Sequence, residues 1–212
     1  MKLFIMKQKS TENKLPIYKL ETTEEIMKYY DEWGNKYDQD MIDWNYAAPK
    51  ETVNAFKKYA TNKEIVILDA GCGTGLVGIE LKKNNYFNID GLDLSKKLLD
   101  LIPKGYYNKL GIADLNKSIN ISNNFYDAVL CVGTFTFGHV KPHALDEFIR
   151  ITKNKGLICF TINEGIYKKN GFDNKIKQLS EKGYWKIKEF FKSDYIINKE
   201  VNAWLGVAEV IK

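Results

Sequence analysis

The stretch that decides the fold is Leu68-Asp69-Ala70-Gly71-Cys72-Gly73-Thr74-Gly75-Leu76-Val77-Gly78. It follows an apolar run over residues 65–68 that has the composition of a buried strand, and it leads into helical periodicity over residues 76–83. Glycines at this place let the backbone turn sharply and approach a ligand closely, and the free N–H groups of the helix start face the same space. The stretch therefore predicts a ligand-binding turn between a strand and a helix.

Short apolar runs alternate with helical segments from residue 64 onward. Strand-length runs rich in branched side chains occupy residues 65–68, 89–92, 128–132 and 157–162, and helical segments occupy residues 76–83, 94–102 and 142–152. Nearly continuous apolar strands separated by helices indicate a parallel sheet covered on both faces. We therefore predict a Rossmann-like α/β fold with a doubly wound, mostly parallel sheet.

The two ends of the chain depart from this alternation. Residues 184–191 and 202–211 have the pattern of two strands whose polar connection is too short for a crossover helix, so we expect an antiparallel hairpin at the sheet edge. Before residue 60 the pattern is helical and aromatic, with a helix expected to open at Pro49. We predict a lysine-rich candidate disordered tail over residues 1–20, an N-terminal helical lid over 21–60 and a cofactor-binding domain over 61–212.

Composition narrows the class of protein. The 212 residues suffice for one domain with an elaboration. No run approaches the roughly 18 apolar residues of a membrane span, and the N-terminal apolar run is too short for a signal peptide, so we expect a soluble cytoplasmic protein without a membrane partner. Monomer and homodimer both stay open.

Charge argues against a nucleic-acid partner. The net charge is +5, but Arg150 is the only arginine among 32 lysines and arginines. Phosphate recognition favours the forked guanidinium group, and the lysines are scattered along the chain. Nucleic acid is therefore not the expected substrate.

Acidic side chains follow three successive strands. The glycine stretch alone is ambiguous, because residues 73–78 also satisfy the dinucleotide fingerprint G-x-G-x-x-G and Asp93 stands where a ribose-binding acid belongs. Asp69, just before the turn, would repel a pyrophosphate but attract an ammonium or sulfonium group. Together with Asp114 after the third strand, these acids fit S-adenosylmethionine, and an NAD-dependent oxidoreductase is the alternative.

Four motifs in order resemble those of class I S-adenosylmethionine-dependent methyltransferases. They lie at residues 66–75, 91–95, 113–115 and 126–129, and the resemblance covers residues 62–212. More narrowly, residues 30–40, 45–49 and 133–140 are similar to the Williams-Beuren-region methyltransferase-like proteins. This narrower resemblance implies no settled substrate.

The resemblance implies a role for each matched position. It implies cofactor binding by Asp69, Gly71, Cys72, Gly73 and Gly75 at the turn around the methionine part, Asp93 and Leu94 at the ribose, Asp114 and Leu115 at the adenine, and Val132 and Gly133 along the methyl-transfer face. Trp33 and Tyr37 are expected to lie over the cofactor, where an aromatic face can meet a sulfonium by cation–π attraction.

The sequence contains two histidines, His139 and His143. His139 follows the fourth strand and is the candidate general base, with a loop histidine bonded to backbone or solvent as the alternative reading. His143 lies four residues later, but Pro142 restricts the residue before it away from helical geometry, so the pair does not share a helix face. We therefore expect no metal site.

These patterns predict a methyltransferase that moves a methyl group from S-adenosylmethionine to a small organic acceptor and releases S-adenosyl-L-homocysteine. Residues 131–134 after the fourth strand lack the Asn-Pro-Pro-Tyr type of sequence typical of amino-group methylases of adenine or glutamine. An oxygen, sulfur or other nitrogen acceptor stays open, as does a polypeptide acceptor. A catalytically silent cofactor-binding partner subunit is a further alternative.

Overall fold

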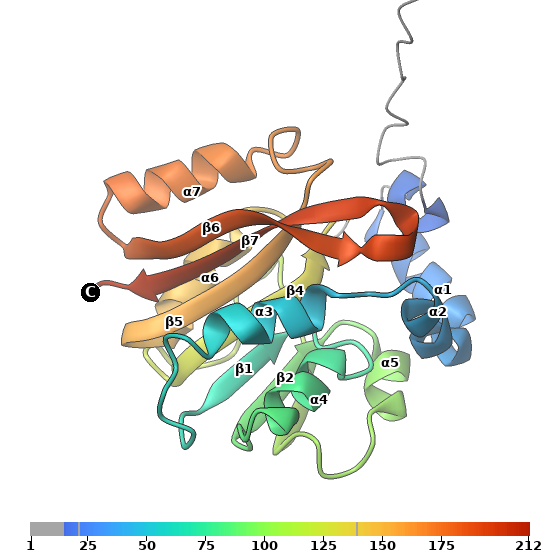
Figure 1. Cartoon of the computed structure of the whole chain (residues 1–212), viewed down its shortest axis with the longest axis horizontal. Coiled ribbons are helices and arrows are strands. Elements are labelled where there is room, and N and C mark those ends of the chain that lie inside the picture. The colour runs from blue at the N-terminus through green and yellow to red at the C-terminus, as the bar shows by residue number, and fades with distance from the viewer. Residues whose placement is uncertain (1–14, 21, 139) are drawn as a thin grey trace, which may run out of the picture.

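A seven-stranded sheet forms the centre of the protein, which the computed structural model describes over residues 15–20, 22–138 and 140–212 (Figure 1). Its strands are β1 (Ile67–Ala70), β2 (Ile89–Asp93), β3 (Lys109–Ile112), β4 (Tyr126–Phe135), β5 (Thr152–Asn163), β6 (Trp185–Ile196) and β7 (Val201–Val210). The order is β3-β2-β1-β4-β5-β7-β6, and β7 runs antiparallel to both of its neighbours. This arrangement confirms the predicted Rossmann-like, mostly parallel sheet with an antiparallel C-terminal hairpin.

The strand order brings the carboxyl ends of the parallel strands together. β1 pairs with β2 on one side and with β4 on the other, so the direction of winding reverses there. Ligands of open α/β sheets bind outside the carboxyl ends at this switch point. Ala70 lies opposite Leu92 in the β1–β2 register, and the turn after β1 therefore adjoins Asp93 at the end of β2.

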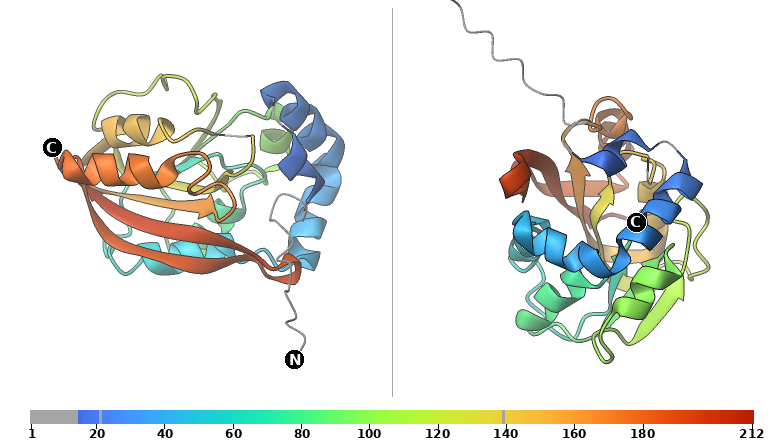
Figure 2. Two further views of the ribbon diagram at one scale, coloured as in Figure 1. Left: turned by 90° about the horizontal axis from the view of Figure 1, so that it is seen from above. Right: turned by 90° about the vertical axis from the view of Figure 1, so that its right-hand side faces the viewer.

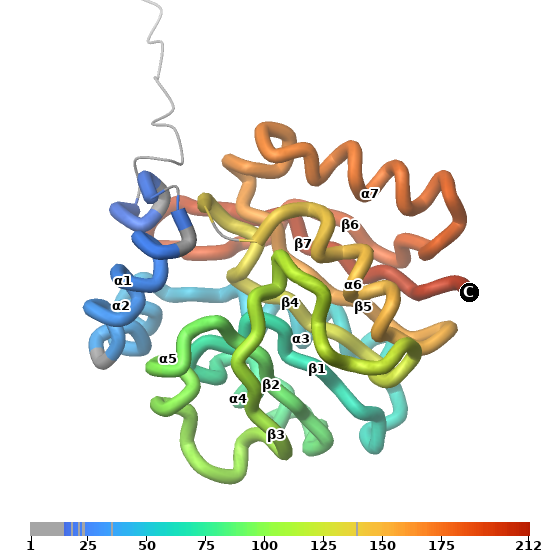
Figure 3. Tube along the Cα trace, turned by 180° about the vertical axis from the view of Figure 1, so that it is seen from behind, coloured from blue at the N-terminus to red at the C-terminus, as the bar shows by residue number. Residues whose placement is uncertain are grey.

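Helices cover both faces of the sheet. Figures 1 and 3 show α3 (Ala48–Phe56) and α4 (Leu76–Lys83) on one face, with α6 (Ala144–Ile151) and α7 (Phe172–Glu181) on the other. The sequence pattern did not indicate α7, whose buried residues Phe172, Ile176 and Leu179 are separated by lysines and other polar side chains. Aromatic packing joins the sheet to the second of these helical layers: Phe135 of β4 packs against Phe172 of α7 with ring centroids 4.9 Å apart.

The N-terminal segment forms short helices beside the carboxyl ends of the strands (Figure 2). They are η2 (Pro16–Lys19), α1 (Thr23–Trp33), η3 (Gly34–Lys36) and α2 (Tyr37–Asp43), and α5 (Lys96–Leu101) lies next to α1. Within the expected tail, Leu15 and Ile17 are buried in the core, so this part of it is packed, whereas residues 1–14 lie outside the described residues.

Residues 44–47 attach this helical segment to the C-terminal hairpin. The Ala47 N–H donates to the Tyr195 carbonyl over 2.9 Å, and the Ile197 N–H donates to the Asn45 carbonyl over 3.2 Å. The η4 turn (Ile197–Lys199) between β6 and β7 therefore supports the helices that precede the sheet in sequence.

The first strand begins two residues later than the apolar run at 65–68 predicted. The Val66 N–H donates to the Asp127 side chain, at 2.9 Å, instead of to a neighbouring strand. Strand pairing with β2 and β4 starts at Ile67. The strand then runs to Ala70, so Asp69 lies inside β1, where it is fully buried, rather than at the mouth of the turn.

Candidate functional site

The glycine turn links β1 to α4 and leaves open space beside it. Gly71 and Gly73 have φ angles of 81° and 53°, in the left-handed region that favours glycine. The N–H groups of Gly71 and Cys72 both donate to the Leu92 carbonyl, at 2.7 and 3.0 Å. A Cβ atom added at Gly73 would meet nothing within 4 Å. The turn is thus held to β2 on one side and open on the other.

Asp93 connects this turn to the next strand. Its Oδ2 accepts from the Gly73 N–H and its Oδ1 from the Ser95 N–H, each at 2.8 Å. Burial raises the pKa of this carboxyl, and the backbone hydrogen bonds oppose the rise. An ionised carboxylate has about four lone-pair sites, so Asp93 retains accepting capacity toward a ligand with hydroxyl groups.

Asp69 lies deeper than predicted and does not line the pocket. The Tyr107 hydroxyl donates to its Oδ2 over 2.6 Å, whereas its buried Oδ1 has no hydrogen-bond partner within the described part of the chain. Burial raises the pKa of this carboxyl to about 7, with nearby Asp93 adding to the rise and the Tyr107 hydrogen bond opposing it. A buried carboxylate of this kind is relieved by a nearby cation.

Asp114 belongs to the loop after β3. Its Oδ1 accepts from the Asn116 N–H at 3.0 Å, and its Oδ2 lies 3.3 Å from the Lys117 ammonium. The Asn116 side-chain oxygen accepts from the Lys141 N–H at 2.8 Å, while the Asn116 carbonyl oxygen lies 2.9 Å from His143 Nε2. These contacts hold the loop after β3 against the segment that follows β4.

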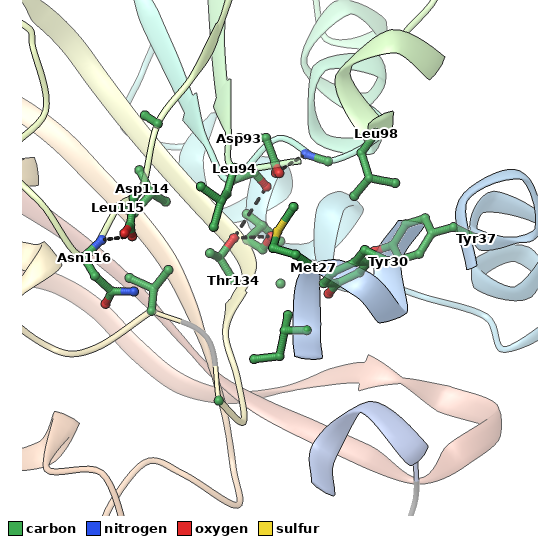
Figure 4. A pocket seen from close by; sticks show the side chains of 18 residues that line it. Met27, Tyr30, Tyr37, Asp93, Leu94, Leu98, Asp114, Leu115, Asn116 and Thr134 are labelled. Atoms are coloured by element: carbon green, nitrogen blue, oxygen red, sulfur yellow. Dashed lines mark hydrogen bonds between the residues drawn. The ribbon is translucent and has the colours of Figure 1, made fainter. Parts of the chain in front are cut away.

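Helix α1 closes the other side of the pocket. Figure 4 shows Met27 and Tyr30 of α1 across the pocket from Asp93 and Leu94. The Thr74 hydroxyl of the glycine turn donates to Asp38 of α2 over 2.6 Å. The helical segment is thus fastened to the turn that it covers.

The pocket encloses about 750 Å³ of empty space, including its open mouth. Most of the predicted cofactor residues line it: Tyr37, Gly71, Gly73, Asp93, Leu94, Asp114, Leu115, Val132 and Gly133. Asp69, Cys72, Gly75 and Trp33 do not. Cys72 is buried with Leu99 and Ile102 beneath the turn. His139, the expected base, lies outside the described residues.

Sequence reasoning missed other lining residues. They are Ile26, Met27, Tyr30, Leu98, Ala113, Asn116, Thr134, Gly138 and Val140. Helical spacing on one face of α1 was the available signal for its three residues, and Thr134, Gly138 and Val140 fall in the 133–140 run that carried the narrower resemblance.

A smaller cavity adjoins the pocket and has about 350 Å³ of empty space, including its open mouth. Tyr30, Tyr37 and Gly133 line both spaces. Trp33 lies here, with its ring centroid 4.9 Å from that of Tyr37, and its Nε1–H donates to Asp40 at 2.5 Å. Trp33 therefore belongs to this second space rather than to the main pocket.

The carboxylates in and behind the wall of the main pocket fit an adenosyl cation better than a pyrophosphate. Asp93 offers acceptors for a ribose diol, the space at Gly73 admits a ligand, and the orphaned oxygen of Asp69 favours positive charge nearby. A diphosphate beside Asp69 and Asp93 would add like charge to a site where burial already raises both pKa values.

Comparison with known proteins identifies the family. A family model described as a methyltransferase domain matches residues 67–156. Human methyltransferase-like protein 27 is 30% identical over 166 residues, a match that covers 75% of this chain and 67% of the human protein. This chain belongs to the class I S-adenosylmethionine-dependent methyltransferases. The human relative is consistent with the narrower resemblance to the Williams-Beuren-region proteins.

One further sequence relative and one solved structure also resemble this chain. An uncharacterized protein of Methanocaldococcus jannaschii is 31% identical over 147 residues, and this methyltransferase covers only 62% of that relative's length. A solved putative S-adenosylmethionine-dependent methyltransferase from Methanococcus maripaludis superposes with a TM-score of 0.61 at 18% identity, covering 89% of this chain and 93% of the other. The structural likeness supports the fold.

Membership of this family implies S-adenosylmethionine as the cofactor and excludes the NAD-dependent oxidoreductase that the glycine fingerprint left open. Within the described residues, no helix is both long and apolar enough to cross a membrane. In the same part of the chain, no group of three or more histidine, cysteine, aspartate or glutamate side chains could hold a metal ion.

The turn predicts unequal effects of two alanine substitutions. A Cβ at Gly71 would collide with the Thr134 side chain, whereas one at Gly73 would enter open space. The left-handed conformation should lower the free energy of unfolding of both variants by about 1–2 kcal/mol. Overpacking should lower that of Gly71→Ala by about 1–3 kcal/mol more. Chemical denaturation of both variants measures this difference, and equal free energies of unfolding would contradict the described turn.

Proposed function

We propose that this methyltransferase transfers the methyl group of S-adenosylmethionine to a small organic acceptor. The observation that carries the proposal is that the main pocket and the smaller aromatic cavity share Tyr30, Tyr37 and Gly133 as lining residues. The larger space suits the cofactor and the smaller one suits a compact acceptor. Helices α1 and α2 contribute walls to the smaller space, which favours a small molecule over a polymer.

We assign the cofactor contacts residue by residue. Asp93 would accept hydrogen bonds from the ribose hydroxyls, and Asp114 would accept from the adenine amino group. The apolar side chains of Leu94 and Leu115 line the same space and suit the faces of the base. Asp69 is buried two residues before Gly71 and does not line the pocket. It would therefore act on the methionine end through its charge and not through a direct contact.

The chemistry asked of the protein is mainly positional. When bound, S-adenosylmethionine supplies a methyl group activated by a sulfonium, with a neutral thioether as the leaving group. The protein has to hold the acceptor in line at about 3 Å and exclude water. The hydrogen bond from Thr74 to Asp38 and the attachment of Ala47 to Tyr195 keep the covering helices in place for this task.

The environment of Arg150 supports the exclusion of a nucleic-acid substrate. Its guanidinium donates to Glu147 and to the carbonyls of Ile119 and Ile121, at 2.8–2.9 Å. The single arginine of the chain therefore stabilises a loop. Phosphate recognition would have to rest on lysines alone.

Incubation of the purified protein with methyl-labelled S-adenosylmethionine and a cell extract tests the proposal. We expect label in a metabolite of low mass. Label in a polypeptide or nucleic acid would contradict the small acceptor, and binding of S-adenosylhomocysteine without any labelled product would favour the silent partner subunit.

Removal of the Asp93 carboxylate should weaken cofactor binding. Asp93→Ala loses charge-assisted hydrogen bonds to the ribose, and we expect S-adenosylhomocysteine to bind about 1–3 kcal/mol more weakly by calorimetric titration. Asp100→Ala is the matched control, because Asp100 is an exposed acid that pairs with Lys96. Unchanged affinity in Asp93→Ala would show the ribose assignment to be wrong.

Cofactor binding should weaken as the pH falls through the pKa of Asp69. The carboxyl has a pKa of about 7, so it is largely neutral at pH 6 and largely charged at pH 8. Affinity for the cationic cofactor should fall by up to about tenfold between pH 8 and pH 6. Asp69→Asn should flatten this dependence, measured by titration at each pH, and a profile equal to that of the wild type would refute the electrostatic role.

The stability of the cofactor-free protein should depend on pH in the direction opposite to that of cofactor affinity. Asp69 binds its proton more tightly in the folded state, because its pKa is raised from 3.8 to about 7. Its contribution to the free energy of unfolding therefore decreases as the pH rises from about 4 to about 7. Asp69→Asn should remove this decrease in a denaturation series.

A further inference from the structure

The smaller cavity beside Gly133 restricts the chemistry of the acceptor. None of its lining residues, among those the structure describes, has a charged side chain. A charged acceptor would lose its hydration there without gaining a countercharge. The cavity therefore favours an uncharged molecule. This inference rests on the proposed function.

Thr136 is the threonine in the lining of this cavity. It follows β4 directly, is 4% exposed and lines the cavity, while its hydroxyl has no hydrogen-bond partner within the described part of the chain. A buried hydroxyl without a partner costs free energy that a ligand group can recover. Thr136 is thus suited to bind a polar substituent of the acceptor.

Two tyrosine hydroxyls lie where the cavity meets the cofactor pocket. A Cβ added at Gly133 would lie 3.6 Å from the Tyr195 hydroxyl and closer still to that of Tyr46. The two rings pack edge to face with centroids 5.3 Å apart. Only glycine at residue 133 leaves room for these hydroxyls beside the methyl-transfer face.

These groups offer no base for removing a proton. Burial raises the pKa of Tyr46 well above its ordinary value, so its hydroxyl stays neutral. The nearby acids are engaged outside the cavity, Asp40 with Trp33 and Asp38 with Thr74. Among the described residues, the cavity therefore suits an acceptor that attacks through a lone pair and needs no deprotonation.

We propose that the cavity binds an uncharged aromatic nitrogen heterocycle and that Thr136 binds its polar substituent. In the transfer step the lone pair of the ring nitrogen forms the bond to the methyl carbon as the carbon–sulfur bond breaks. The electrons of the broken bond remain on sulfur, giving neutral S-adenosylhomocysteine, and the positive charge moves to the methylated ring. The charged methylated ring gains no countercharge in this cavity, which favours its release.

Four probes of similar ring size test the charge selection: 3-acetylpyridine, 3-methylpyridine, benzoate and benzylammonium. Their binding to the complex of the protein with S-adenosylhomocysteine is measured by calorimetry at pH 7.5. We expect both uncharged pyridines to bind at least about tenfold more tightly than either charged ring. Equal binding of a charged ring, or no binding of the pyridines, would overturn the inference.

The role of Thr136 is tested by turnover with labelled donor. Thr136→Val should lower kcat/KM for 3-acetylpyridine about 3–10-fold and leave 3-methylpyridine unchanged, and Thr136→Ser should restore the difference between the two probes. Equal effects on both probes, or none, would overturn the role of Thr136. Affinity for S-adenosylhomocysteine and labelling of extract metabolites, measured separately, decide whether the proposed function itself has failed.

Discussion

The carboxylate of Asp93 is the interaction on which the rest of the site depends. It accepts from the glycine turn after β1 at Gly73 and from Ser95 at the start of α5, each at 2.8 Å. This bridge requires the β1–β2 register that sets Ala70 opposite Leu92, because a shift of one residue would turn every side chain of the strand to the other face. Turn, strand end and helix start therefore form one unit, and the ligand space takes its shape from that unit.

The burial of two carboxylates in this unit, more than a direct contact with the ligand, favours a positively charged ligand. Burial raises the pKa of Asp69 and that of Asp93, nearby Asp93 raises the pKa of Asp69 further, and the buried Oδ1 of Asp69 lacks a partner among the described residues. A cationic ligand offsets this cost, whereas an anionic one adds to it. The preference for a positively charged cofactor thus follows from a carboxylate that stands behind the pocket wall, and a direct contact is not needed to produce it.

The sequence predicted the sheet type and the helix α4, but it missed the helix α7 and the contacts between distant segments. Helical periodicity over residues 76–83 matches α4 residue for residue, because strand, glycine turn and helix are contiguous and each obeys a local rule. The burial of Asp69 was missed because it depends on pairing with β2 and β4, which are distant in sequence. The smaller cavity was missed for the same reason. It joins Ile17, α1, α2 and Ile196, which no periodicity relates.

The covering helices are held by the glycine turn and by the C-terminal hairpin. Asp38 accepts from Thr74 in the glycine turn, and Ala47 donates to Tyr195 in the C-terminal hairpin. One contact holds the helices to the cofactor side and the other to the side of the smaller cavity. A change in the N-terminal helices should therefore alter the proposed acceptor space more than the strand-end carboxylates. If the cofactor contacts come from the ends of β1, β2 and β3 as proposed, acceptor specificity can vary through the helices and the hairpin.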